Sequence, residues 1–110
     1  MTERLRELID EVVWSTDDTQ CVTAQTRIII KKHVLPMAWP GPILSSLREW
    51  AEKQAQSHGD KASKLDSVIL GMIKHNVVVS SVQVLCDHHR RISGRYKTVL
   101  SFIWMLRVAV

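Results

Sequence analysis

Three prolines between positions 36 and 42 divide this chain into two stretches that have helical character. Proline lacks an amide hydrogen and pushes the residue before it away from the α region, so we expect no helix to run through Pro36 or Pro40. The connector is short and apolar, and we expect Trp39 within it to pack onto the core. Such a connector joins parts of one domain, and 110 residues suffice for a single buried core.

Before the connector, apolar residues recur at helical spacing with acidic residues on the opposite face, which predicts a helix over 3–14. The apolar positions are Leu5, Leu8, Ile9, Val12 and Val13. The polar run 15–18 predicts a break in which Ser15 or Thr16 caps a second helix, although one continuous helix to Leu35 is the alternative. From Asp18 to Leu35 a helix is favoured, with a strand across 26–30 left open.

After the connector, Pro42 is suited to the first turn of a third helix, which we expect to end at 57–59 because Gly59 readily adopts a left-handed conformation. Asp60 is expected to cap a fourth helix that ends near Asn76. Gly71 within that helix predicts a close helix crossing.

The β-branched residues 77–79 favour a strand, yet the spacing of the apolar positions favours a helix from about Val78 to Ile92, ended by Gly94. The last helix is expected from about Tyr96 to Val110. Its inward positions are Val99, Leu100, Ile103, Leu106 and Val110. This helix is apolar nearly all round, which predicts a central helix or a dimer surface. The sequence thus predicts an all-α fold, a single compact bundle of five or six helices over 1–110.

Charge is unevenly distributed along the chain. Residues 1–18 carry six acidic and two basic side chains, a net charge of −4, whereas residues 19–110 carry +8. A basic surface of this kind favours nucleic acid, anionic lipid or an acidic protein surface as the partner.

Basic residues cluster in two main stretches, with Lys61 and Lys64 forming a third. The candidate nucleic-acid-binding residues are Arg90, Arg91, Arg95, Lys97 and His88 in one stretch and Arg27, Lys31 and Lys32 in the other. Basic side chains near helix ends are suited to phosphate contacts. Because no base-recognition motif is present, the pattern predicts binding of nucleic acid, RNA first, without sequence readout.

The alternative is a protein-interaction module or homodimer. An apolar last helix, an apolar connector and an acidic first helix are typical of such a protein. The candidate partner-binding residues are Trp39, Phe102 and Trp104.

Catalytic or metal chemistry has weaker support. Cys86 with His88 or His89 is one loose ligand pair, whereas structural zinc sites use two pairs. No nucleophile and base are paired at a useful spacing, so we expect a non-enzymatic protein that has no metal or other cofactor. Cys21 and Cys86 are expected to be free thiols in a reducing intracellular setting, and no stretch reaches the length of a membrane span.

Two short stretches carry resemblances to viral proteins. Val84-Leu-Cys-Asp followed by Arg90-Arg91 is similar to a helix of lentiviral matrix proteins. Residues 65–78 are similar to the long helix of nodaviral RNA-silencing suppressors. In this chain, Gly59 is expected to interrupt such a helix. Neither stretch assigns a family, but the mixture of Trp, His, Cys and Arg fits a small viral accessory protein.

Overall fold

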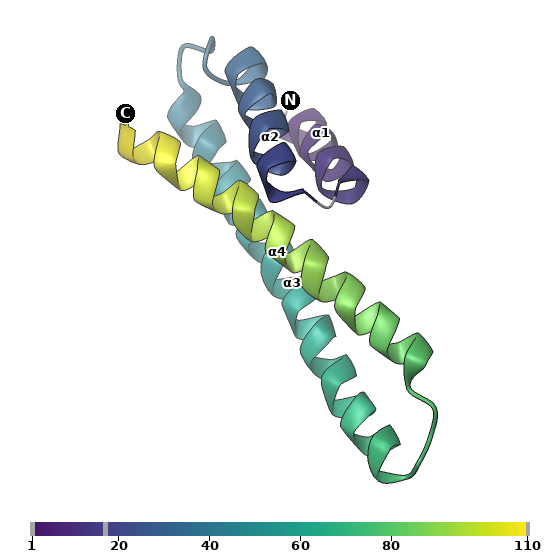
Figure 1. The fold of residues 1–110 in the computed structure, drawn as a ribbon. Helices are drawn as coiled ribbons and strands as arrows, with labels where there is room; N and C mark the ends of the chain where they lie inside the picture. Colours follow the sequence, from purple (N-terminus) through teal and green to yellow (C-terminus); the bar gives the residue numbers. More distant parts are fainter. Residues whose placement is uncertain (1, 17, 110) are drawn as a thin grey trace.

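The computed structural model describes residues 2–16 and 18–109, which form four helices and no strand. They are α1 (Thr2–Ser15), α2 (Thr19–His33), α3 (Pro40–Lys74) and α4 (Ser80–Ala109). Figure 1 shows α3 and α4 as a long antiparallel hairpin, with α1 and α2 packed against one end of it. The molecule is elongated, with extents of 59 × 23 × 21 Å. The all-α class is confirmed, but the expected five or six helices reduce to four.

The first reason for the lower number is that α3 runs straight through Gly59. At this point α3 presents the small residues Ala55 and Gly59, and Ser93 of α4 lies against them. The Ser93 hydroxyl donates to the carbonyl of Ala55 at 2.7 Å. Packing of α4 against this small-residue surface outweighs the roughly 1 kcal/mol helix penalty of glycine, so the expected end at 57–59 is wrong.

The second reason is that α4 runs through Gly94. Neither Gly94 nor Gly71 has a heavy atom within 4 Å of the position that a Cβ would take. Gly71 therefore does not mark a close helix crossing, and Gly94 is an ordinary interior position of a helix. The expected helix end at Gly94 is wrong because the apolar face of α4 continues past it into the core.

The break between α1 and α2 is confirmed, and the alternative of one long helix is wrong. Asp18 is the N-cap of α2, with its carboxylate accepting from the amide of Gln20 at 2.9 Å. Thr16, which was one of the two expected caps, accepts from the amide of Asp18 at 3.2 Å. The segment 26–30 is helical, and the buried Thr26 and Ile30 are spaced by four residues on the inner face of α2.

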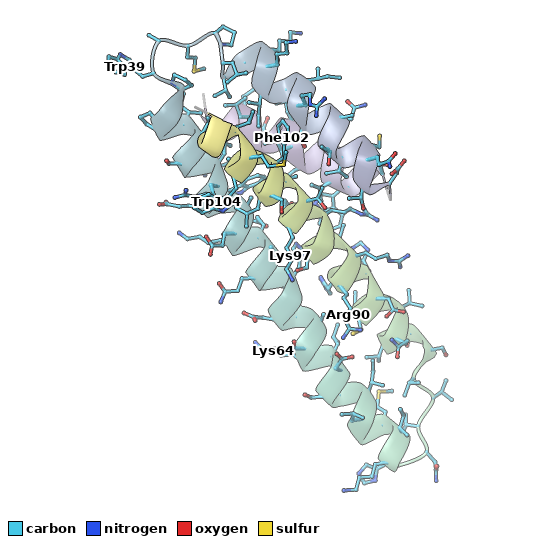
Figure 2. The ribbon with its side chains drawn as sticks, turned by 60° about the vertical axis from the view of Figure 1, so that its left-hand side comes forward. Trp39, Lys64, Arg90, Lys97, Phe102 and Trp104 are labelled. Atoms are coloured by element: carbon cyan, nitrogen blue, oxygen red, sulfur yellow. The ribbon has the colours of Figure 1, made fainter. Side chains whose placement is uncertain are left out.

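The proline connector ends α2 and starts α3 as expected, with Val34 as the C-cap of α2 and prolines in the first turn of α3. The expected packing of Trp39 is wrong. This side chain is 81% exposed, and Figure 2 shows it at one extremity of the molecule, away from the helices. The connector passes beyond the end of the bundle, so its central residue has no core to pack onto.

The turn between α3 and α4 corrects another boundary. Residues 77–79 are not helical, and α4 begins at Ser80 rather than near Val78. Asn76 has a positive φ of 59°, and the amide of Val77 donates back to the carbonyl of Met72 at 2.8 Å. This left-handed residue ends α3 and lets the chain reverse.

The hydrophobic core lies mainly where all four helices meet. It includes buried residues of each helix: Leu5, Ile9, Val13, Val22, Ile30, Val34, Leu44, Leu47, Ala51, Ala55, Ile92, Tyr96, Val99, Phe102 and Ile103. Beyond the end of α1 the hairpin continues alone, and there the buried cluster comprises Ala62, Ile69 and Cys86. We call this part, residues 61–74 of α3 and 80–87 of α4, the distal stem.

The C-terminal part of α4 belongs to the central core. Of the two expectations for this segment, a central helix or a dimer surface, the structure has the central helix. Val99 and Ile103 are buried and Leu100 and Leu106 are half-buried, whereas Val110 lies outside the described residues. Helix α4 packs against each of the other three helices.

Candidate nucleic-acid interface

The basic residues predicted on α4 divide between two sides of the helix. Arg90 and Lys97 are seven residues apart and lie on the side that borders α3 (Figure 2). Arg90 forms an ion pair with Asp66 of α3, and Lys97 is exposed. Because consecutive residues of a helix are separated by about 100°, Arg91 lies on a different side from Arg90.

Arg95 has a structural role. Its guanidinium donates to the carbonyl of Val13 at 2.7 Å, in the last turn of α1. Helix C-termini have carbonyls without intrahelical partners and a partial negative charge, which a cation satisfies. The next residue, Tyr96, donates its hydroxyl to Asp10 of α1 at 2.5 Å. Burial, and then this hydrogen bond, raise the pKa of Tyr96, so the phenol stays protonated. Two adjacent residues of α4 therefore hold α1.

The basic residues of α2 form a separate group. The guanidinium of Arg27 lies 5.8 Å from the centre of the Phe102 ring, at the C-terminal part of α4. Lys31 and Lys32 are exposed in the last turn of α2, next to the connector. The eight predicted residues thus do not form one continuous surface.

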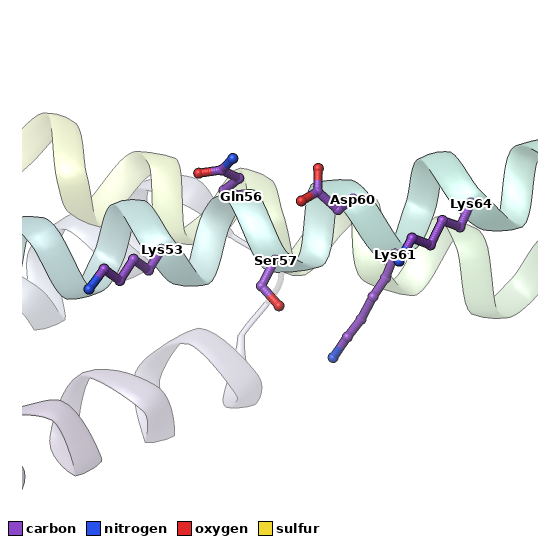
Figure 3. A pocket seen from close by; sticks show the side chains of 6 residues that line it. All are labelled: Lys53, Gln56, Ser57, Asp60, Lys61 and Lys64. Atoms are coloured by element: carbon purple, nitrogen blue, oxygen red, sulfur yellow. The ribbon is translucent and has the colours of Figure 1, made fainter.

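A basic surface that the sequence showed only in part lies on α3. An open depression of about 340 Å³ is lined by Lys53, Gln56, Ser57, Asp60, Lys61 and Lys64. Figure 3 shows these side chains on neighbouring turns of one helix. Among the described residues, none of its three lysines makes an ion pair or a side-chain hydrogen bond. The expected helix break at Gly59 concealed the helical spacing that joins Lys53 to Lys61 and Lys64. We call this surface the lysine depression.

A group of histidines lies beside it, where α1 ends. His58 is buried, with 7% of its surface exposed, and its Nδ1 is 2.9 Å from Nδ1 of His89. The ring of Trp14 lies 5.8 Å from His58 and 5.2 Å from His88. Burial, and then nearby positive charge including Lys61, lower the pKa of both His58 and His89. One of the two facing nitrogens donates and the other accepts, which requires at least one neutral ring. The sequence marked His88 as a phosphate ligand but gave no indication of this pair.

Cys86 is a core residue on the inward face of α4. Its side chain is fully buried, and its thiol donates to the carbonyl of Ala62 at 3.3 Å. Burial and the hydrogen bond to Asp66 raise the pKa of the Cys86 thiol, which disfavours the nucleophilic thiolate. No three His, Cys, Asp or Glu side chains in the described part of the chain are placed to hold a metal ion.

The three predicted partner-binding aromatics differ in exposure. Trp39 is 81% exposed and Trp104 is 46% exposed, with the guanidinium of Arg48 lying 4.2 Å from the Trp104 ring centre. Phe102 is only 6% exposed, so its ring belongs to the core.

Among residues 2–16 and 18–109, no helix has the length and hydropathy that crossing a membrane requires. Comparison of the chain with protein-family models, with curated proteins and with solved structures found no match.

Proposed function

We propose that this protein binds RNA without reading its sequence, through phosphate contacts along the basic part of the α3–α4 hairpin. The observation that carries the proposal is the lysine depression, where Lys53, Lys61 and Lys64 line one open surface of α3 together with Asp60 and form no ion pair with any described residue. Exposed lysine side chains that form no ion pair are available to replace counterions on a phosphate backbone.

The charge of the surrounding hairpin supports the proposal. Residues 53–97 contain eight Lys or Arg and three Asp, a net charge of +5 before any histidine is counted, which exceeds the +4 of the whole chain. Acidic residues are concentrated in 1–18 instead. An elongated basic rod is suited to duplex RNA, which proteins recognise mainly through its shape and its phosphates.

Arg91 and Lys97 are exposed and are kept in the proposed surface. Arg90 contributes less in this proposal, because Asp66 already neutralises it. Arg95 holds α1, and Arg27, Lys31 and Lys32 lie on another helix, so the proposal assigns them no phosphate contact.

The test is fluorescence anisotropy with short RNA duplexes of unrelated sequence over a range of salt concentrations. We expect similar affinities for all sequences and a steep loss of affinity with salt. The double variant Lys61→Gln, Lys64→Gln should reduce the slope of log K against log salt by about 2, since each lost phosphate contact releases about one counterion fewer.

The matched control is Lys31→Gln, Lys32→Gln, which removes the same charge from α2. It should leave the slope unchanged. Absence of binding to RNA at low salt refutes the proposal, and equal effects of the two double variants refute the assignment to α3. Tighter binding to DNA duplexes of the same sequences would show that the ligand is DNA rather than RNA.

The exposure of Trp39 favours a second candidate function, binding of a protein partner through the connector. A tryptophan that is 81% exposed on a proline-stiffened segment loses little entropy when a partner covers it. Trp39→Ala should leave the thermal unfolding midpoint unchanged and weaken such a complex, and an unaffected complex would exclude this role.

A further inference from the structure

Trp14 is an exposed tryptophan that is held in a fixed position at the end of α1. Its side chain is 50% exposed. The ring is tilted against His88 of α4 and meets His58 of α3 edge-on. The carbonyl of the preceding residue, Val13, accepts a hydrogen bond from Arg95 of α4. An exposed aromatic ring that is already fixed loses little entropy when a ligand stacks on it, so Trp14 is a pre-formed contact for a flat group.

The lysines of α3 continue the side of this helix that α1 covers. Arg6 of α1 donates to the hydroxyl of Ser46 at 3.4 Å, so α1 lies over this side of α3. Lys64 follows Ser46 by eighteen residues, or five helical turns, and therefore lies at the same angle. Lys61 lies one turn after His58, and around the helix it is between His58 and Lys64. This side of α3 is thus covered by α1 along its first part and carries exposed lysines beyond it.

Helix α4 has a cation on the same side of the hairpin. His88, Arg91 and Arg95 follow one another at intervals of three and four residues, so they lie on one side of α4. Because His88 lies against Trp14 and Arg95 binds the end of α1, this is the side that α1 covers. Arg91 is exposed and forms no ion pair with any described residue. Trp14 therefore bridges two helices that both present cations on its side.

The charge of the surface reverses at Trp14. Glu7, Glu11 and Trp14 are separated by four and three residues, so two exposed acidic side chains share its side of α1. Glu7 pairs with Arg4, whereas Glu11 forms no ion pair with any described residue. A phosphate backbone that follows the cations of the hairpin towards α1 is repelled by Glu11 once it passes Trp14. The group that reaches Trp14 is therefore a base, which is flat and uncharged, at the end of the bound backbone.

We propose that Trp14 stacks on an unpaired base at the end of the RNA duplex that the hairpin binds, so that the protein prefers duplexes with a single-stranded extension. This inference rests on the proposed binding of RNA and adds the feature of the RNA that is favoured. An unpaired base is free to turn towards a fixed ring, whereas a base pair keeps the plane that the duplex imposes. Stacking on an aromatic ring accepts every base, so binding without sequence readout is retained.

The test compares two RNAs by fluorescence anisotropy with the full chain. Both contain the same duplex and a short extension of one strand, which carries its bases in one RNA and is abasic in the other. The two RNAs have the same number of phosphates, so their difference in affinity measures contacts to the bases of the extension. We expect the wild-type protein to bind the RNA that carries the bases about tenfold more tightly.

Substitutions assign this difference to one ring. Trp14→Leu should bind the two RNAs with equal affinity, and Trp14→Phe, which keeps a ring, should retain part of the difference. The matched control is Trp39→Leu, which replaces another exposed tryptophan, 81% exposed in the connector, and should keep the full difference. Circular dichroism reports whether each variant keeps its helices.

A measurement on the wild-type protein keeps the inference testable even if Trp14→Leu does not fold. 2-Aminopurine placed in the extension should fluoresce less in the complex than in the free RNA, because stacking on an aromatic ring quenches it. Unchanged fluorescence in the complex refutes the inference.

Two further results separate this inference from the proposed function. A wild-type protein that binds both RNAs equally refutes the stacking role and leaves the phosphate contacts of the lysine depression intact. A folded Trp14→Leu chain that still prefers the RNA with bases also refutes it, because another group must then contact the base. Absence of binding to either RNA refutes the proposed function and this inference together, and leaves Trp14 to a protein partner.

Discussion

Gly94 is the residue at which a single added methyl group should stabilise this protein. It lies in the interior of α4, and a Cβ there would have no heavy atom within 4 Å. Alanine restricts the unfolded chain and favours the helix, so Gly94→Ala should raise the free energy of unfolding by about 1 kcal/mol. Urea unfolding monitored by circular dichroism measures this, and a loss of stability would show that α4 does not continue through position 94.

The facing histidines should make stability depend on pH. Because the pKa values of His58 and His89 are lowered in the folded state, the unfolded chain binds more protons at mildly acidic pH. Their contribution is therefore fully present above the unfolded value of about 6.5 and is lost as the pH falls below it towards the folded values.

Unfolding midpoints measured at a series of pH values should thus decrease below about 6.5. His89→Gln should flatten this decrease, since it leaves one titrating group where two faced each other. The control His75→Gln alters an exposed histidine in the turn and should leave the decrease of the unfolding midpoint with falling pH unchanged. A steeper decrease in His89→Gln would contradict the proposed origin.

Single residues also show where sequence reasoning was limited. The inward face of the C-terminal part of α4 followed from helical spacing, because periodicity reports which side of a helix is buried. Gly59 misled because its helix-breaking tendency is a local property, whereas its contact with Ser93 depends on a residue far away in the chain. The pairing of His58 with His89 has the same cause and left no pattern in the sequence.

Among the helices, α2 offers the clearest test of a terminus. Asp18→Ala removes the side chain that accepts from the amide of Gln20 and should lower the free energy of unfolding by about 1 kcal/mol. Asp18→Asn retains an acceptor and should cost only a few tenths. Urea titration distinguishes the two, and equal losses would mean that charge near the helix N-terminus, rather than the hydrogen bond, is what stabilises it.

Helix boundaries were predicted well where the backbone itself imposes them. The prolines at 36–42 and the polar run at 15–18 separate helices in the structure as they do in the sequence. Boundaries that depended on glycine were wrong twice, because a helix that is packed along its length tolerates glycine. The lysine depression extends across one of these supposed boundaries, which explains why its three lysines were not grouped.

At the level of the whole molecule, the protection of backbone amides from hydrogen exchange should decrease along the hairpin from the four-helix end to the distal stem. Four helices bury residues 44–55 of α3, whereas two helices bury residues 62–74. In dilute protein, amide hydrogen exchange should be faster for residues 66–74 than for 44–51, because opening the distal stem exposes less apolar surface. Mass spectrometry of the two segments measures this, and equal protection in the monomer would contradict the division.

The predicted all-α class was correct, but the predicted compact shape was wrong, because spacing within helices does not fix how long two helices remain paired and the molecule is elongated. The basic character of the chain was visible in its composition. Its separation into an α3 surface, two sides of α4 and an α2 group required the three-dimensional arrangement of the helices.

The length of the α3–α4 hairpin has a consequence that follows from the helical repeat, since eighteen residues make five complete turns. A hairpin shortened or lengthened by eighteen residues in each helix would present the same sides of α3 and α4 in the same directions. A change of nine residues would rotate everything beyond it by half a turn and move the apolar residues to the opposite side. The length of this hairpin can therefore change without rotating its faces only in steps that are close to whole numbers of helical turns.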